Sequence, residues 1–135
     1  MPSTIIIGSG FLAHSFKKHE NLFKKLNICV YAAGVSNSLC QNKDLFEKDK
    51  NRLASFSKQI DKKDTILYFS TCSIDDPSRN KNEYITNKLI IENSIKLKFK
   101  KYIIIRLPEV VGYTKNDNTL IKFFFNKIKN KKTFN

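Results

Sequence analysis

Residues 5–13 read Ile-Ile-Ile-Gly-Ser-Gly-Phe-Leu-Ala, a short apolar run followed by a glycine-rich turn. The isoleucines predict a buried strand, and the Gly-x-Gly-x-x-Ala pattern predicts a tight turn from that strand into a helix. In an α/β fold that binds nucleotides, Gly8 permits the turn, Gly10 lets a phosphate approach the backbone, and the small Ala13 lets helix and strand pack closely. We therefore expect residues 8–12 to bind phosphate at the start of the helix, with a plain strand-to-helix turn as the alternative.

The rest of the chain repeats this order of strand and helix. Short apolar runs rich in β-branched or aromatic residues predict buried strands over residues 4–8, 28–32, 65–70 and 102–107. Helices are predicted over residues 11–20, 42–59, 82–98 and 118–129. This alternation favours a parallel sheet with right-handed crossovers and helices that cover both faces. The predicted fold class is α/β: a single Rossmann-like, three-layer αβα domain over residues 1–135, with a reduced, mainly parallel sheet of about four strands.

Length and composition fit one compact domain. The chain has 135 residues, of which 41% are hydrophobic, and this is enough for one core. No apolar run reaches the roughly 18 residues of a membrane-spanning helix, and no signal sequence precedes the first strand. We therefore expect a cytoplasmic protein with no membrane partner.

The three cysteines, Cys29, Cys40 and Cys72, lack the spacing of a disulfide framework or a zinc site, so we expect reduced thiols and no metal.

A formal net charge of +13 raises the question of a polyanionic partner. The lysines are spread along the chain, mostly in pairs, and only Arg52, Arg79 and Arg106 are arginines. Specific recognition of phosphate or guanine usually uses the arginine fork. We therefore expect a solvated lysine surface and no nucleic-acid partner, with polyanion binding by the lysines as an alternative.

Groups suited to proton transfer follow the third predicted strand. This strand ends at Ser70 and Thr71, and the next helix carries Tyr84 and Lys88. Residues four apart share one face of a helix, and an ammonium beside a phenol favours the phenolate. A hydroxyl at the carboxyl end of the neighbouring strand could hold a substrate oxygen beside that tyrosine. The alternative for Tyr84 and Lys88 alone is an amphipathic helix with one buried aromatic residue.

The order of these features carries a family resemblance. After the glycine turn come Ala-Ala-Gly at 32–34, Ser-Thr-Cys-Ser at 70–73, the Tyr84/Lys88 pair, and Arg-Leu-Pro-Glu-Val-Val-Gly at 106–112. Over nearly its whole length the chain resembles the NAD-dependent epimerase/dehydratase family, the extended short-chain dehydrogenases that act on nucleotide sugars.

The resemblance implies NAD or NADP as cofactor, with NAD preferred, and a nucleotide-sugar substrate. It implies that Thr71, Tyr84 and Lys88 are catalytic, with Ser73 as a second choice for the hydroxyl. The tyrosine of the family acts as acid or base on a sugar hydroxyl, and the lysine also holds the nicotinamide ribose. The resemblance further implies a homodimer that packs the helix after the second strand against the tyrosine-bearing helix. The implied cofactor-binding residues are Gly8, Ser9, Gly10, Phe11, Leu12, Ala32, Ala33, Gly34, Ser70, Pro108 and Val110.

The chain also departs from the family. Family members usually have two more strands and a helix after the first helix, and these build the adenosine pocket; here residues 21–27 occupy that interval, so the first strand is expected at or near a sheet edge. No acidic residue stands at 27–31, where a ribose-binding carboxylate is expected. Glu109 stands where the family commonly has Asn, and most of the C-terminal substrate-binding region is lacking. A non-catalytic, truncated module that acts through oligomerisation or partner binding is therefore the second hypothesis.

Overall fold

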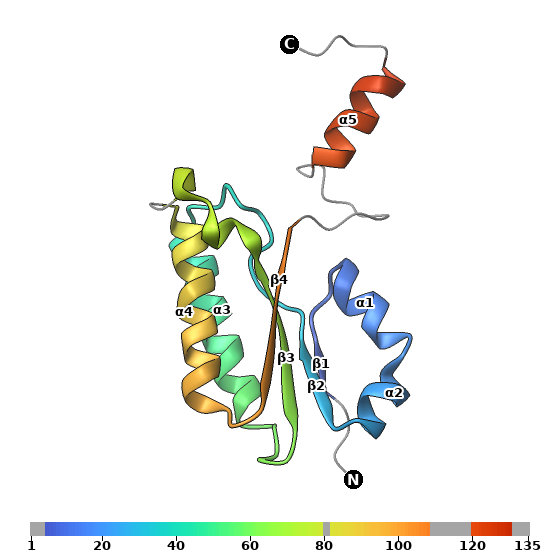
Figure 1. Ribbon diagram of the computed structural model, residues 1–135, viewed down its shortest axis with the longest axis vertical. Helices are drawn as coiled ribbons and strands as arrows, with labels where there is room; N and C mark the ends of the chain where they lie inside the picture. The colour runs from blue at the N-terminus through green and yellow to red at the C-terminus, as the bar shows by residue number, and fades with distance from the viewer. Residues whose placement is uncertain (1–4, 80–81, 109–119, 131–135) are drawn as a thin grey trace.

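The fold is a parallel sheet between two layers of helices, as predicted. The computed structural model describes residues 5–79, 82–108 and 120–130. Strands β1 (Ile6–Ile7), β2 (Ile28–Tyr31), β3 (Thr65–Thr71) and β4 (Tyr102–Leu107) are all parallel and lie in the order β1-β2-β3-β4 (Figure 1). β1 is at an edge of the sheet, as expected. The predicted α/β class is confirmed, and the strand positions agree with the prediction to within two residues at each end.

The helices also follow the prediction, with one exception. The longer ones are α3 (Lys43–Ser57), α4 (Glu83–Lys98) and α5 (Leu120–Lys129). The single helix expected over residues 11–20 is instead two short helices, α1 (Phe11–Lys17) and α2 (Glu20–Lys25). The Phe23 ring on α2 packs against Phe16 on α1, with ring centroids 5.1 Å apart. Short 3-10 helices follow β3 over Cys72–Asp75 and Pro77–Arg79.

Alternate residues of the strands build a core on each face of the sheet. Tyr31 and Tyr68 point to the side of α3 and α4, where they pack with Leu53, Phe56, Ile91 and Ile95. Val30, Leu67 and Phe69 point to the opposite side, where Leu12, Phe16 and Phe23 of α1 and α2 cover them. The period of two residues along a strand produces this division. Figure 1 shows α1 and α2 on one side of the sheet and α3 and α4 on the other.

The connection from β1 to β2 has an unusual hand. Each strand is added on the same side of the preceding one, so crossovers of one hand would keep all the helices on one face. Because α1 and α2 lie opposite α3 and α4, the first crossover is left-handed and the next two are right-handed (Figure 1). The expectation of right-handed crossovers is therefore wrong for this connection.

One face of β4 is less covered than expected. Ile103 and Ile105 pair with Leu67 and Phe69 on the α1–α2 side, but they are 44% and 39% exposed. Among the described residues, α1 and α2 cover this side of β1 to β3 and pack with Leu107 at the end of β4, but they leave Ile103 and Ile105 partly exposed. Among the described helices, none combines the length and apolar character needed to cross a membrane.

Candidate active site

The glycine turn after β1 has the packing that its sequence predicts. Gly8 has φ +134°, and a Cβ atom there would lie 2.6 Å from the carbonyl oxygen of Ala32 and 2.9 Å from the Ala13 Cβ. Only glycine fits this backbone and this contact. A Cβ on Gly10, by contrast, would meet no atom within 4 Å. The turn therefore joins β1 closely to the end of β2 and leaves open space beside Gly10.

The residues next to these glycines are divided between surface and core. Ser9 is exposed, Phe11 is half-buried, and Leu12 packs in the core on the α1–α2 side. Gly10 is the residue before the first turn of α1, and no side chain bonds to the amides there. Those amides remain available to an anion.

The start of α4 fixes Tyr84 and Lys88. The Asn82 side chain accepts a hydrogen bond from the Tyr84 amide at 2.8 Å, which caps the helix, and donates one to the Ser38 carbonyl at 3.0 Å. Asn82 thereby ties the beginning of α4 to the loop after β2. Tyr84 is 7% exposed and packs with Phe46 and Ile85.

Lys88 is the most unusual residue of the site. The residue is only 6% exposed. Its Nζ lies 5.5 Å from the ring centroids of both Tyr68 and Tyr84. A Cβ on Gly34 would lie 3.6 Å from this Nζ, so the absence of a side chain at residue 34 keeps the space beside the ammonium open. Burial lowers the pKa of Lys88, while the negative charges of Asp49 and Glu92 act in the opposite direction. In the described part of the chain, the groups placed around this Nζ are the two tyrosine rings and the space beside Gly34.

Asp49, on α3, is the polar residue of the site that sequence reasoning missed. It is 1% exposed and accepts hydrogen bonds from the Tyr31 hydroxyl at 2.9 Å and from the Asn87 side chain at 3.1 Å. Its two carboxylate oxygens would lie 3.3 and 3.4 Å from a Cβ on Gly34. Asp49 thus lies on the same side of Gly34 as Lys88. One feature of the sequence could have indicated that Asp49 is buried. It stands one helical turn before Leu53 and two turns before Phe56, so it shares the apolar face of α3 with them.

The hydroxyl groups after β3 lie at the carboxyl edge of the same sheet. Thr71 is the last residue of β3 and is 6% exposed. Its Oγ1 accepts a hydrogen bond from the Ser73 amide at 3.2 Å, which starts the 3-10 helix. Ser70 is also buried, whereas Ser73 is half-buried. Thr71 is therefore held in one orientation by the backbone that follows it.

An ion pair between the buried Glu92, one turn after Lys88 on α4, and the partly exposed Arg106 supports this part of the sheet. Glu92 accepts two hydrogen bonds from Arg106 of β4, at 3.1 and 3.0 Å. Burial alone would raise the pKa of Glu92, but the hydrogen bonds and charge of Arg106 outweigh it and lower this pKa. Arg106 also reaches the exposed Asp75 at 3.4 Å. The pair joins α4 to β4.

The predicted site residues divide into three groups. The turn at Gly8 contacts Ala32, and two residues further Gly34 lies beside Lys88, so contacts link the glycine turn to the tyrosine–lysine helix along the end of β2. Ala32 and Ala33 lie between them, half-buried. Thr71 and Ser70 are at the end of the next strand. Pro108 is exposed after β4, and Val110 and Glu109 lie outside the described residues.

The chain matches no family model, no curated protein and no solved structure. In the described residues, no group of three or more histidine, cysteine or acidic side chains is arranged to hold a metal ion. The fold and the contacts around Lys88 are therefore the observations that bear on function.

Proposed function

We propose that this chain is an NAD(P)-dependent enzyme of the epimerase, dehydratase or reductase type that acts on a nucleotide sugar. Thr71, Tyr84 and Lys88 form its proton-transfer site. The observation that carries the proposal is the environment of Lys88: a buried ammonium that faces the rings of Tyr68 and Tyr84 and lies beside Gly34. Burial of an ammonium is costly, and the hydroxyl groups of a bound ribose would offer Lys88 hydrogen-bond acceptors.

Two features of the glycine turn support dinucleotide binding. The open space beside Gly10 allows a pyrophosphate to approach the backbone, and the first amides of α1 would donate to its oxygens. The adenosine side fits less well, because residues 27–31, where a ribose-binding carboxylate is expected, contain no Asp or Glu. We therefore infer that the chain holds a dinucleotide mainly through its pyrophosphate and nicotinamide ribose.

The chain's own groups have separate tasks in this proposal. The Tyr84 hydroxyl exchanges a proton with a hydroxyl of the sugar, and the ammonium of Lys88 favours the phenolate form. Thr71 orients the substrate oxygen, and the Asn82 cap fixes the helix that carries Tyr84. The nicotinamide, when bound, supplies the hydride acceptor or donor. Asp49 and Glu92 help to keep Lys88 protonated in spite of its burial.

Titration calorimetry with NAD+, NADH and their phosphorylated forms tests the proposal. The wild-type protein is expected to bind at least one of them, and Lys88→Met is expected to weaken binding by about tenfold or more, the effect of about one charge-assisted hydrogen bond. Tyr84→Phe is expected to bind normally but to lose turnover of nucleoside diphosphate hexoses. Lys98→Met, an exposed lysine on the same helix, is the matched control. No binding heat at millimolar cofactor would contradict the proposal.

A second candidate function is assembly without catalysis. Leu45 on α3 and Leu89 and Ile90 on α4 are 43%, 37% and 40% exposed, and Ile103 and Ile105 expose part of the sheet. Such apolar residues on neighbouring elements favour a protein interface. Stable self-association together with no affinity for any dinucleotide would favour this function over the first.

A further inference from the structure

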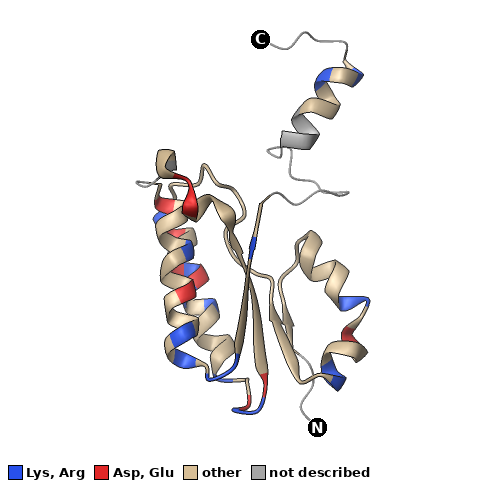
Figure 2. Cartoon of the chain, in the orientation of Figure 1, with Lys and Arg blue, Asp and Glu red and all other residues tan. Residues whose placement is uncertain are grey.

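The end of the sheet where the strands begin, opposite the candidate site, is strongly basic. A lysine pair precedes each of the last three strands: Lys24-Lys25 before β2, Lys62-Lys63 before β3, and Lys100-Lys101 before β4. Because the strands are parallel, the segments that enter them lie at one edge. We call these six lysines, together with Leu26, Leu97 and Tyr102, the amino-edge surface. Figure 2 shows blue segments at this lower end of the molecule, at the ends of α2 and α4, at the start of β4 and, next to red segments, on the loop before β3.

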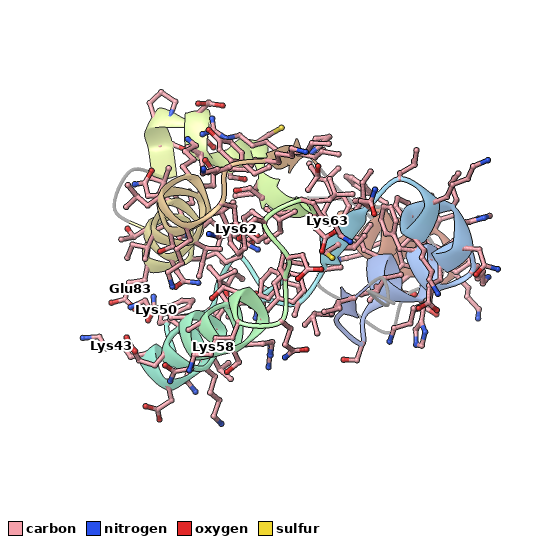
Figure 3. The ribbon with its side chains drawn as sticks, turned by 90° about the horizontal axis from the view of Figure 1, so that it is seen from below. Lys43, Lys50, Lys58, Lys62, Lys63 and Glu83 are labelled. Carbon is pink, nitrogen blue, oxygen red and sulfur yellow. The ribbon has the colours of Figure 1, made fainter. Side chains whose placement is uncertain are left out.

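Hydrogen bonds between the loops bring the lysine pairs together on one surface. The Thr65 amide donates to the Asn27 carbonyl at 2.8 Å, which joins the first two loops. The Ile66 amide donates to the Lys101 carbonyl at 3.1 Å, and Lys101 Nζ donates to the Lys63 carbonyl at 3.4 Å. Figure 3 looks onto this edge and shows Lys62 and Lys63 on the loop that crosses it.

Few acidic groups offset this charge. All six lysines are exposed. Asp61 forms an ion pair with Lys63 at 3.8 Å, and Asp64 is 7% exposed and accepts a hydrogen bond from the Asp61 amide. Exposed pairs of this kind contribute little to stability, so Lys63 remains available to another anion. The surface therefore carries a positive potential.

Large apolar side chains lie among the lysines. Leu97, in the last turn of α4, is 88% exposed, and Leu26, directly after α2, is 54% exposed. Tyr102, the first residue of β4, is 42% exposed. Leucine and tyrosine at an exposed basic edge are costly in water but favourable at the boundary between lipid headgroups and acyl chains.

We propose that the amino-edge surface binds anionic lipid bilayers. Its lysines attract the phosphate groups of the membrane surface, and Leu26 and Leu97 insert between the headgroups. Nucleic acid fits less well, because residues 20–27, 58–65 and 96–102 contain no arginine and only two aromatic residues besides Tyr102, Phe23 and Phe99, both packed in the core. A membrane partner of this kind differs from the expectation of no membrane partner, which rested on the lack of a long apolar segment. The surface lies at the opposite edge from the candidate site, so the proposal is independent of the proposed enzyme activity.

Sedimentation with vesicles tests the proposal on the full chain. We expect binding to phosphatidylcholine vesicles that contain about 30% phosphatidylglycerol, and no binding to phosphatidylcholine alone. Binding should weaken strongly between about 0.1 M and 1 M salt, as the screening length falls from roughly 10 to 3 Å. Lys62→Glu/Lys63→Glu should lower the partition coefficient by about tenfold or more, and Leu97→Ser by about fivefold.

The control variant is Lys43→Glu/Lys48→Glu, which makes the same change in net charge on exposed residues of α3 away from this edge. It should retain most of the vesicle binding. An equal loss in both double variants would show that only net charge matters and would overturn the proposal. So would the absence of vesicle binding, or a higher affinity for RNA or DNA oligonucleotides than for the anionic vesicles at the same salt concentration.

Discussion

Asp49 illustrates how a single buried charge can control another. Its carboxylate lies on the Gly34 side of Lys88, and its charge raises the pKa of that lysine against the opposing effect of burial. The hydrogen bonds from Tyr31 and Asn87 hold the carboxylate in place. Burial and the charge of Asp49 in turn raise the pKa of Tyr31, so the Tyr31 hydroxyl stays protonated and continues to donate to Asp49.

Replacement of Asp49 tests this relation directly. Asp49→Asn removes the negative charge but keeps the size of the side chain, so the pKa of Lys88 should fall further below its usual value. NMR titration of the lysine side-chain signals measures the change. If turnover requires the ammonium, the alkaline limb of the pH–rate profile should move to lower pH by the same amount. Asp61→Asn, at an exposed residue, is the control, and an unchanged Lys88 titration in Asp49→Asn would contradict the prediction.

The two glycines of the first turn should respond differently to alanine. Gly8→Ala would push a Cβ to 2.6 Å from a backbone oxygen at φ +134°, and should lower the free energy of unfolding by about 2–3 kcal/mol. Gly10→Ala meets no atom within 4 Å and should cost less than about 1 kcal/mol. Urea denaturation measures both values. An equal decrease in the free energy of unfolding in the two variants would contradict the prediction, because it would show that the close contact at Gly8 does not destabilise Gly8→Ala.

The sequence predicted these residue-level features unevenly. Gly8 and Ala13 could be paired from their spacing, because a Gly-x-Gly-x-x-Ala turn has one packing solution between strand and helix. Tyr84 and Lys88 could be paired because the helical period is regular. Asp49 could not be connected with Lys88, because the contact joins two helices far apart in the chain and depends on the sheet between them.

At the scale of elements, the Glu92–Arg106 pair joins α4 to β4. Glu92 is 1% exposed and receives two hydrogen bonds from the guanidinium. Glu92→Gln should lower the free energy of unfolding at neutral pH by about 1.5–3 kcal/mol, the usual contribution of charged hydrogen bonds. Asp75→Asn, which loses a contact of 3.4 Å at a surface site, should cost at most about 0.5 kcal/mol.

The same pair gives stability a defined pH dependence. The folded pKa of Glu92 is lowered, so this carboxylate contributes stability above its unfolded pKa of about 4.5 and loses that contribution as pH falls through the folded value. Thermal melts between pH 7 and pH 3 should therefore show a smaller difference between wild type and Glu92→Gln at the acid end. A difference that stays constant with pH would contradict this assignment.

Strands and long helices could be predicted to within a few residues, because apolar runs and the caps at Asn42 and Asn82 mark their ends. The break between α1 and α2 could not. Lys18 and His19 give no strong stop signal, and the break depends on the packing of Phe23 against Phe16. The exposure of Ile103 and Ile105 was also missed, because an apolar run in a strand does not reveal whether a helix lies above it.

At the scale of the whole molecule, the exposed residues on α3 and α4 predict a homodimer. Leu45, Leu89 and Ile90 would become buried if these helices packed across a two-fold axis, as the family resemblance implies. Light scattering at micromolar concentration should give twice the mass of 15.7 kDa. Leu89→Glu/Ile90→Glu should give a monomer, and Leu39→Glu, at a 75% exposed residue in a loop, should not. A monomeric wild-type protein would contradict the prediction.

The overall architecture could be predicted from the alternation of strands and helices. The hand of the first crossover could not, because it depends on which side of β1 the chain returns to.

The left-handed first crossover has a consequence for the cooperativity of unfolding. Strands β2 to β4 and their two helices form a regular right-handed unit. Within residues 5–79, by contrast, β1 has two residue pairs with β2, and the connection between these two strands has the opposite hand. The N-terminal segment should therefore open as a separate unit, and its backbone amides should exchange with solvent deuterium well before those of β3.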